Sequence, residues 1–146
     1  MSAAENAFLA VVRAAGGLLR GVEVLLNRHE LTAAQYNVLR ILRGAGEQGA
    51  CGREIASRLI TAEPDITRLL DRMEKRGLIL RRRDAKDRRF VTAWIAPLGL
   101  ETLAALDAPV AALHRRQFGR LSEAELKRLM AALEKLRDCV EPPEPA

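Results

Sequence analysis

The feature that most constrains the fold is a change of hydrophobic period in the middle of the chain. On both sides of residues 78–95, apolar residues recur at steps of three and four, which is the spacing of amphipathic helices. Inside this segment, "LILRRR" and "RFVTAWI" are rich in β-prone residues and are separated by "DAKD". Phe90, Thr92 and Trp94 would lie on one face of a strand, opposite the residues between them. The pattern predicts one β-hairpin in an otherwise helical protein.

Two helices are predicted near the N-terminus. An apolar stripe predicts a long amphipathic helix over about residues 4–28. "LTAAQY" then predicts a helix start, because Thr32 can cap the amides that follow and Gln35 can reach back to form a capping box. This second helix is expected to end near Gly44, before the glycine-rich connector "GAGEQGACG".

Two further helices are predicted before the hairpin. "REIASRLI" predicts a short helix with Ile55, Leu59 and Ile60 turned inward. The next helix is expected over about residues 63–76, capped by Thr61 and carrying "EPD" in its first turn.

The segment after the hairpin predicts two more helices and a tail. "PLGLETLAAL" begins the first of them. "LSEAEL" is a second capping box, formed by Ser122 and Glu125, which opens a last helix ending near residue 140. "EPPEPA" follows, and we expect a disordered tail at residues 142–146.

The order helix, short helix, turn, helix and hairpin predicts a winged helix-turn-helix. The fold class is therefore mainly α with a small β-hairpin wing, and the winged lobe covers residues 31–97. Residues 1–30 and 98–141 are predicted to form a helical dimerisation region. A lobe of this size does not need two long flanking helices to fold, so their apolar stripes would find a partner in a two-fold dimer. The alternative is that they pack only within their own chain.

The basic charge of the chain is concentrated in one segment. Hydrophobic residues make up 49% of the chain, so a packed fold is expected, and the formal net charge is +5. Between Arg68 and Arg89 there are ten basic and four acidic residues, whereas the remainder is close to neutral. "RRRDAKDRRF", residues 81–90, alone holds five arginines. Such a patch is typical of a protein that binds a polyanion, although a solvated basic surface is the alternative.

The helix at residues 63–76 is the expected recognition helix, which lies in the major groove of DNA. Arg68 is near its N-terminal end, where an arginine can form two hydrogen bonds with guanine. The predicted DNA contacts on this helix are Asp65, Thr67, Arg68 and Arg72.

The hairpin tip, residues 81–90, is expected to enter the minor groove, where the negative potential favours arginine. Asp87 could hold the guanidinium of Arg89 in an extended fork. The other arginines, of which Arg81, Arg83 and Arg88 are the candidates, would contact phosphates.

Four motifs, "LTAAQYNVLRIL", "DITRLLDRMEKRGLILR", "DAKDRRFV" and "APLG", occur in the order and spacing of the MarR family of bacterial and archaeal transcriptional regulators. The resemblance covers about residues 5–140. It implies a homodimer whose terminal helices interlock, a pseudo-palindromic operator, and release from DNA by small anionic or phenolic effectors or by oxidants. The chain departs from the family at Ile95-Ala96, where Leu-Thr is common.

The resemblance also assigns roles to single residues. It implies that Asp87 and Arg89 are the wing pair and that Thr67 and Arg68 are recognition-helix contacts, with Arg88 on a phosphate. It further suggests an effector pocket at Tyr36 and Trp94, although these side chains also suit the core.

The other chemically reactive residues give weaker patterns. Cys51 lies near Arg53 at a helix start, which could activate its thiol, and Cys139 could lie at an interface. His29 and His114 are far apart in sequence, so we expect no metal site. No catalytic constellation is present, so neither a catalytic residue nor a cofactor is expected.

The sequence therefore predicts a dimeric, sequence-specific DNA-binding transcriptional regulator, a repressor released by a small-molecule effector. No long apolar run and no signal-peptide pattern is present, so we expect a cytoplasmic protein that does not contact a membrane. Two alternatives remain open: a DNA-binding sensor switched by a thiol or a metal, and a winged-helix module that binds other proteins.

Overall fold

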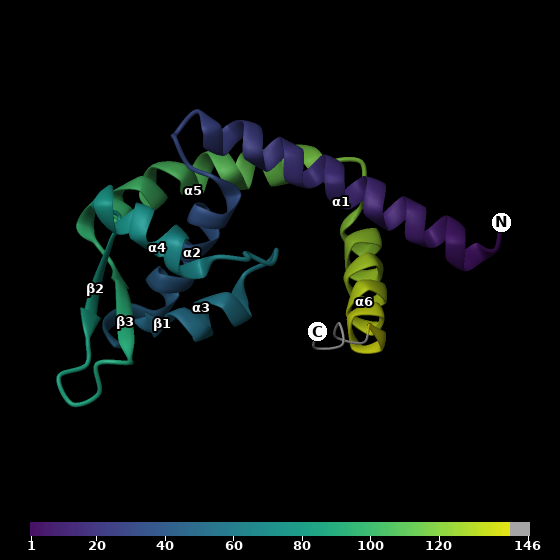
Figure 1. The fold of residues 1–146 in the computed structure, drawn as a ribbon. Coiled ribbons are helices and arrows are strands. Elements are labelled where there is room, and N and C mark those ends of the chain that lie inside the picture. The colour runs from purple at the N-terminus through teal and green to yellow at the C-terminus, as the bar shows by residue number, and fades with distance from the viewer. Residues whose placement is uncertain (141–146) are drawn as a thin grey trace. The chain divides into compact units, whose positions relative to one another are not determined.

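A computed structural model describes residues 1–140, and these are mostly helical with one small sheet (Figure 1), which confirms the predicted fold class. The elements in chain order are α1 (Ala3–Asn27), α2 (Ala33–Ala45), the 3-10 helix η1 (Gly46–Gln48), β1 (Ala50–Cys51), α3 (Gly52–Arg58), α4 (Ile66–Lys75), β2 (Ile79–Arg83), β3 (Val91–Ile95), α5 (Pro97–Gln117) and α6 (Glu123–Cys139). The chain divides into two compact units, the second of which begins at His114. None of the helices formed by residues 1–140 is long and apolar enough to cross a membrane.

The core of the first unit lies between α2, α3, α4 and α5. Leu39 and Leu42 of α2, Ile55 of α3, Met73 of α4 and Leu103 of α5 are completely buried. Each belongs to an apolar stripe at helical spacing, so burying one face of every helix builds a common core. This core fixes the position of α4, whose opposite face is left exposed.

The helix starts follow the predicted capping boxes. The hydroxyl of Thr32 accepts a hydrogen bond from the amide of Gln35 at 3.1 Å, and the Gln35 side chain accepts one from the Thr32 amide. Ser122 and Glu125 form the same reciprocal pair at α6. Both predictions are confirmed.

The sheet has three antiparallel strands in the order β1-β3-β2. The hairpin register pairs Arg81 with Ala93, and β1 adds Cys51 opposite Thr92. The strand β1 was not predicted, because its two residues lie inside the glycine-rich segment, which the sequence presents only as a connector. A Cβ at Gly49, which has φ +63°, would come 2.5 Å from the carbonyl oxygen of Ala93. Glycine therefore allows this connector to approach β3 and pair with it.

The predicted start of the recognition helix was wrong. α4 begins at Ile66 and not at residue 63, and its N-cap is Asp65, which accepts a hydrogen bond from the amide of Arg68 at 2.9 Å. Thr61 is not the cap. Asp is a somewhat better N-cap than Thr, and Pro64 disfavours a helical conformation in the residue before it, so the helix starts after the proline.

The predicted inward orientation of Ile60 was also wrong. α3 ends at Arg58, and the side chain of Ile60 is 79% exposed in the turn that follows. Ile55 is buried and Leu59 is half-buried, as expected. The predicted tail at residues 142–146 lies outside the described residues.

Candidate nucleic-acid interface

The exposed face of α4 carries the residues predicted to read DNA. Leu69, Leu70 and Met73 are buried against the core. Thr67, Arg68 and Arg72 are all exposed, because the helical period turns them away from that buried face. The carboxylate of Asp65 caps the helix, which gives it a role within the protein, and its DNA contact stays a prediction.

The wing tip holds the predicted fork between Asp87 and Arg89. The Arg89 side chain donates to the two carboxylate oxygens of Asp87 at 3.0 and 2.9 Å, and the Arg89 amide adds a bond of 3.1 Å. The Arg89 side chain is nevertheless 88% exposed. The hydrogen bonds from Arg89 hold the pKa of Asp87 below its usual value, and Asp87 in turn raises the pKa of Arg89. The tip therefore presents an oriented, permanently charged guanidinium.

Two contacts that build the wing turn were not predicted. Asp84 accepts hydrogen bonds from the amides of Lys86 and Asp87 at 2.7 and 3.3 Å, an Asx turn of the kind expected for "DAKD". The guanidinium of Arg83 donates to the carbonyl of Arg88 at 2.9 Å. Arg83 thus ties the end of β2 to the turn, although the residue remains exposed.

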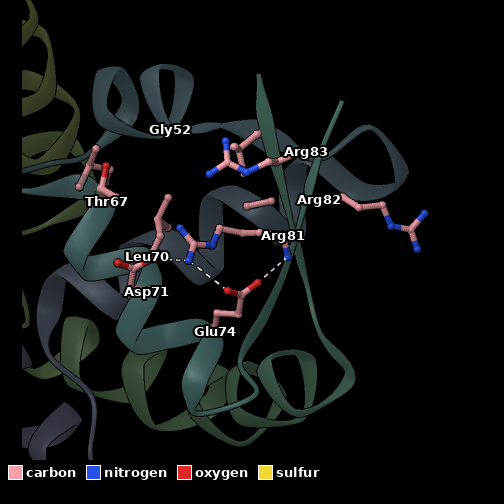
Figure 2. Close-up of a pocket in the computed structure, with 11 residues that line it drawn as sticks. Gly52, Thr67, Leu70, Asp71, Glu74, Arg81, Arg82 and Arg83 are labelled. Atoms are coloured by element: carbon pink, nitrogen blue, oxygen red, sulfur yellow. Dashed lines mark hydrogen bonds and ion pairs between the residues drawn. The ribbon is translucent and has the colours of Figure 1, made fainter. Parts of the chain in front are cut away.

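Arg81 is turned toward α4 (Figure 2), which argues against its predicted role as a phosphate contact. Its guanidinium forms ion pairs with Asp71 and, at 3.0 Å, with Glu74, and only 18% of its side chain is exposed. Burial alone would lower the pKa of Arg81, but the hydrogen bonds to Asp71 and Glu74 outweigh it and raise that pKa. Two carboxylates already balance this charge, so little of it remains for DNA.

A groove of about 530 Å³ lies between α4, the start of α3 and the inner face of the hairpin. Figure 2 shows Thr67 and Arg83 at this groove, with Arg82 pointing away from it. Neither Tyr36 nor Trp94 lines it.

The two aromatic residues predicted for an effector pocket have contacts of their own. Tyr36 is buried in the core, and the guanidinium of Arg40 lies 5.9 Å from the centre of its ring. The indole of Trp94 donates to the carbonyl of Glu47 at 2.9 Å, which ties β3 to η1. These contacts give both side chains a packing role, and the effector pocket stays a prediction.

The cysteines also lie in identifiable surroundings. Cys51 is half-buried at the start of α3, and its thiol donates to the carboxylate of Glu54 at 3.4 Å. The contacting charge is therefore negative, whereas the sequence had suggested Arg53. Cys139 is exposed at the end of α6.

Comparison with known proteins places this geometry among transcriptional regulators. A family model described as MarR family matches residues 31–91. The HTH-type transcriptional regulator TtmR of Methylorubrum extorquens is 40% identical over 90 residues, which are 62% of this chain and 45% of that protein. The chain thus spans less than half the length of TtmR.

Two other matches cover more of both proteins. The uncharacterized HTH-type transcriptional regulator YkoM of Bacillus subtilis is 32% identical over 108 residues, which are 73% of this chain and 68% of YkoM. The crystal structure of a MarR transcription factor from Planctomyces limnophilus is 40% identical, with a TM-score of 0.73. The match covers 92% of this chain and 97% of the chain from Planctomyces limnophilus.

Proposed function

The chain belongs to the MarR family of transcriptional regulators, and we propose that it binds double-stranded DNA as a homodimer. One observation carries this proposal. The exposed polar face of α4 and the charged fork of Asp87 and Arg89 belong to one lobe, and both stand on elements that the same core and sheet hold in place. A helix and a ribbon arranged in this way suit two neighbouring grooves of a duplex.

The roles of the single residues follow from their surroundings. Thr67 and Arg68 lie in the first turn of α4, where a recognition helix meets base edges, and we assign them to the major groove. The Arg89 side chain is 88% exposed and oriented by Asp87, and it is assigned to the minor groove. Arg72 and Arg88 are exposed and are assigned to phosphates.

The second unit supports the homodimer. A groove within it is lined mostly by apolar side chains, together with His114 and Arg115; the apolar ones are Phe118, Leu121, Leu126, Leu129, Met130 and Leu133. Met130 is 61% exposed and Leu129 and Leu133 beside it are exposed as well, and a contiguous apolar patch of this kind marks an interaction surface. A two-fold dimer would bring two lobes to major grooves about 34 Å apart and would favour a pseudo-palindromic operator.

The regulatory output is a further part of the proposal. We assign the protein as a repressor that a small-molecule effector releases from DNA, since an effector that binds only one conformation shifts the population toward it. The proposal includes no catalytic activity and goes with a cytoplasmic location, where the chromosome of a bacterium or archaeon is accessible.

The test is selection of bound fragments from random duplex DNA, followed by titration of the selected site with Arg89→Ala. Arg89→Ala should weaken binding about tenfold, in the range of one good polar contact, while the dimer and the melting temperature stay unchanged. Arg13→Ala removes the same charge from α1, outside the wing, and serves as the control.

Two results would count against this proposal. If the Arg13 control stayed dimeric by sedimentation and lost as much affinity as Arg89→Ala, the effect would be one of net charge only. If the wild type bound no duplex even at low salt, the module that binds other proteins would become the better interpretation.

A further inference from the structure

The wing is joined to the recognition helix by an ion cluster of Arg81, Asp71 and Glu74, which we call the wing brace. The guanidinium of Arg81 on β2 contacts both carboxylates of α4, with a distance of 3.0 Å to Glu74. Asp71 and Glu74 are three residues apart and so lie on the same face of α4. Figure 2 shows all three side chains converging between the helix and the ribbon.

Glu74 binds Arg81 at both its side chain and its backbone. One carboxylate oxygen accepts from the guanidinium at 3.0 Å, and the other accepts from the Arg81 amide at 3.1 Å. β2 is an edge strand of the sheet, so the amides on its open side lack a strand partner. Glu74 accepts the hydrogen bond of one such amide. Its two contacts therefore fix both the position of β2 along the axis of α4 and the distance between β2 and α4.

The brace lies where apolar packing ends. Leu78 and Ile79, at the base of the hairpin, are buried and held by the core. Beyond Arg81, the ribbon and α4 line the groove described above. Within residues 1–140, no hydrogen bond or ion pair joins α4 to the wing further toward the tip. Among the described residues, the brace is therefore the polar contact between α4 and the wing that lies nearest to the tip.

We propose that the wing brace positions the wing against the recognition helix, so that Arg81 controls operator affinity without touching DNA. This inference rests on the proposed DNA-binding function. Two groups that enter two grooves of one duplex must both be held close to their productive geometry, within about half an ångström. If the wing moved independently of α4, the Arg89 contact would be lost, or the wing would have to become ordered on binding, which would reduce the affinity for DNA.

Removing an acidic residue of the brace gives a clear test, because electrostatics and loss of positioning predict opposite changes in the affinity for DNA. Glu74→Gln deletes a negative charge beside a polyanion, so electrostatics alone predicts tighter binding. Loss of the brace predicts binding that is weaker by about tenfold. Asp71→Asn should act in the same direction. Glu101→Gln removes the same charge from an exposed position on α5 and should cause no loss.

The variants of Arg81 separate positioning from direct contact. Arg81→Lys keeps the charge but not the planar fork that contacts two carboxylates, so it should bind as weakly as Arg81→Met. A phosphate contact would instead be largely retained by lysine. In the Arg81→Met background, Glu74→Gln should cause no further loss of affinity, because only its electrostatic effect remains, and Arg89→Ala should cost less than it does in the wild type.

The outcomes distinguish this inference from the function on which it rests. If the wild type binds its site and Glu74→Gln binds equally well or better, the brace is overturned and the DNA-binding proposal stands. If the wild type binds no duplex, both fall. Thermal unfolding of each variant checks the fold. Should Arg81→Met fail to fold, Glu74→Gln and Asp71→Asn decide the matter, because each leaves Arg81 one charged partner.

Discussion

The winged lobe and the last helix place similar apolar residues in different surroundings. α2 buries five residues, and its Leu39 and Leu42 are completely inaccessible. α6 shows comparable leucine spacing, yet none of its 17 residues is buried, and Leu133 is 42% exposed. Helical periodicity therefore identifies an apolar face but not what covers it.

α1 combines the two situations within a single helix. Leu26, near its C-terminal end, is completely buried and belongs to the core of the lobe. Phe8 and Val12, toward its N-terminal end, are 66% and 52% exposed. The lobe thus has a core of its own, whereas the exposed apolar residues of α1 and α6 fit the proposed homodimer, in which a second chain covers them.

The largest expected effect comes from breaking the core of the lobe. Leu39→Ala should lower the free energy of unfolding by about 2–5 kcal/mol, because it leaves a cavity where no solvent enters. Leu136→Ala on α6 removes the same atoms from a side chain that is 48% exposed. It should cost far less at protein concentrations that favour the monomer. Denaturant titration measures both, and equal losses would contradict the contrast between these regions.

The second prediction concerns the exposed apolar face of α6, where an added charge should weaken the proposed dimer. Met130→Lys should raise the dissociation constant of the proposed dimer by about tenfold or more, since the new charge would have to lose its water. Ala131→Lys adds the same charge outside the apolar groove, on the face that carries Lys127 and Glu134, and is the control. Sedimentation equilibrium measures the dimer dissociation constants of the wild type and of both variants. A dimer that tolerates both variants would place the interface elsewhere.

Much of the fold could be predicted from contacts between residues close in sequence. The capping boxes at Thr32 and Ser122 span three residues, and the fork between Asp87 and Arg89 spans two. Such contacts depend on local geometry and side-chain chemistry, which the sequence displays directly. The same holds for the hairpin, whose alternating pattern and polar turn are continuous in the chain.

The contacts that were missed join separate elements. Arg81 was expected on DNA, because nothing in a run of arginines shows which one meets two carboxylates on the preceding helix. The pairing of β1 with β3 depends on residues far apart in the chain and on the absence of a side chain at Gly49. The cap of α4 was wrong for a different reason: Thr61 and Asp65 were both suitable, and the proline between them decided the matter.

The caps offer a finer test of the same comparison. Thr32→Ala should lower the stability of the lobe by about 1 kcal/mol, because α2 starts within its core. Ser122→Ala should leave the unfolding of the lobe unchanged and weaken the proposed dimer instead. Thr32→Ser keeps the hydroxyl and should be close to neutral. Circular dichroism melts check the first result, and equal destabilisation by the two alanine variants would argue against independent roles.

The smallest effect concerns acid and an ion pair that joins α2 to α5. Arg43 of α2 binds Asp107 of α5 through two hydrogen bonds of 2.9 and 3.1 Å. The hydrogen bond from Arg43 lowers the pKa of Asp107 below its ordinary value of 3.8. A carboxyl group with a lowered pKa in the folded state stabilises the protein fully above that ordinary value and loses the contribution as the pH falls through the lowered one.

Asp107→Asn should therefore melt slightly below the wild type at pH 7, and the difference should shrink below pH 3.8 as the wild-type carboxyl group takes up its proton. Added salt at pH 7 should also reduce the difference, because both side chains are partly exposed. Calorimetric melts at several pH values measure it. A difference that persists unchanged through the acid range would mean that packing, and not charge, makes Asp107 useful at this contact.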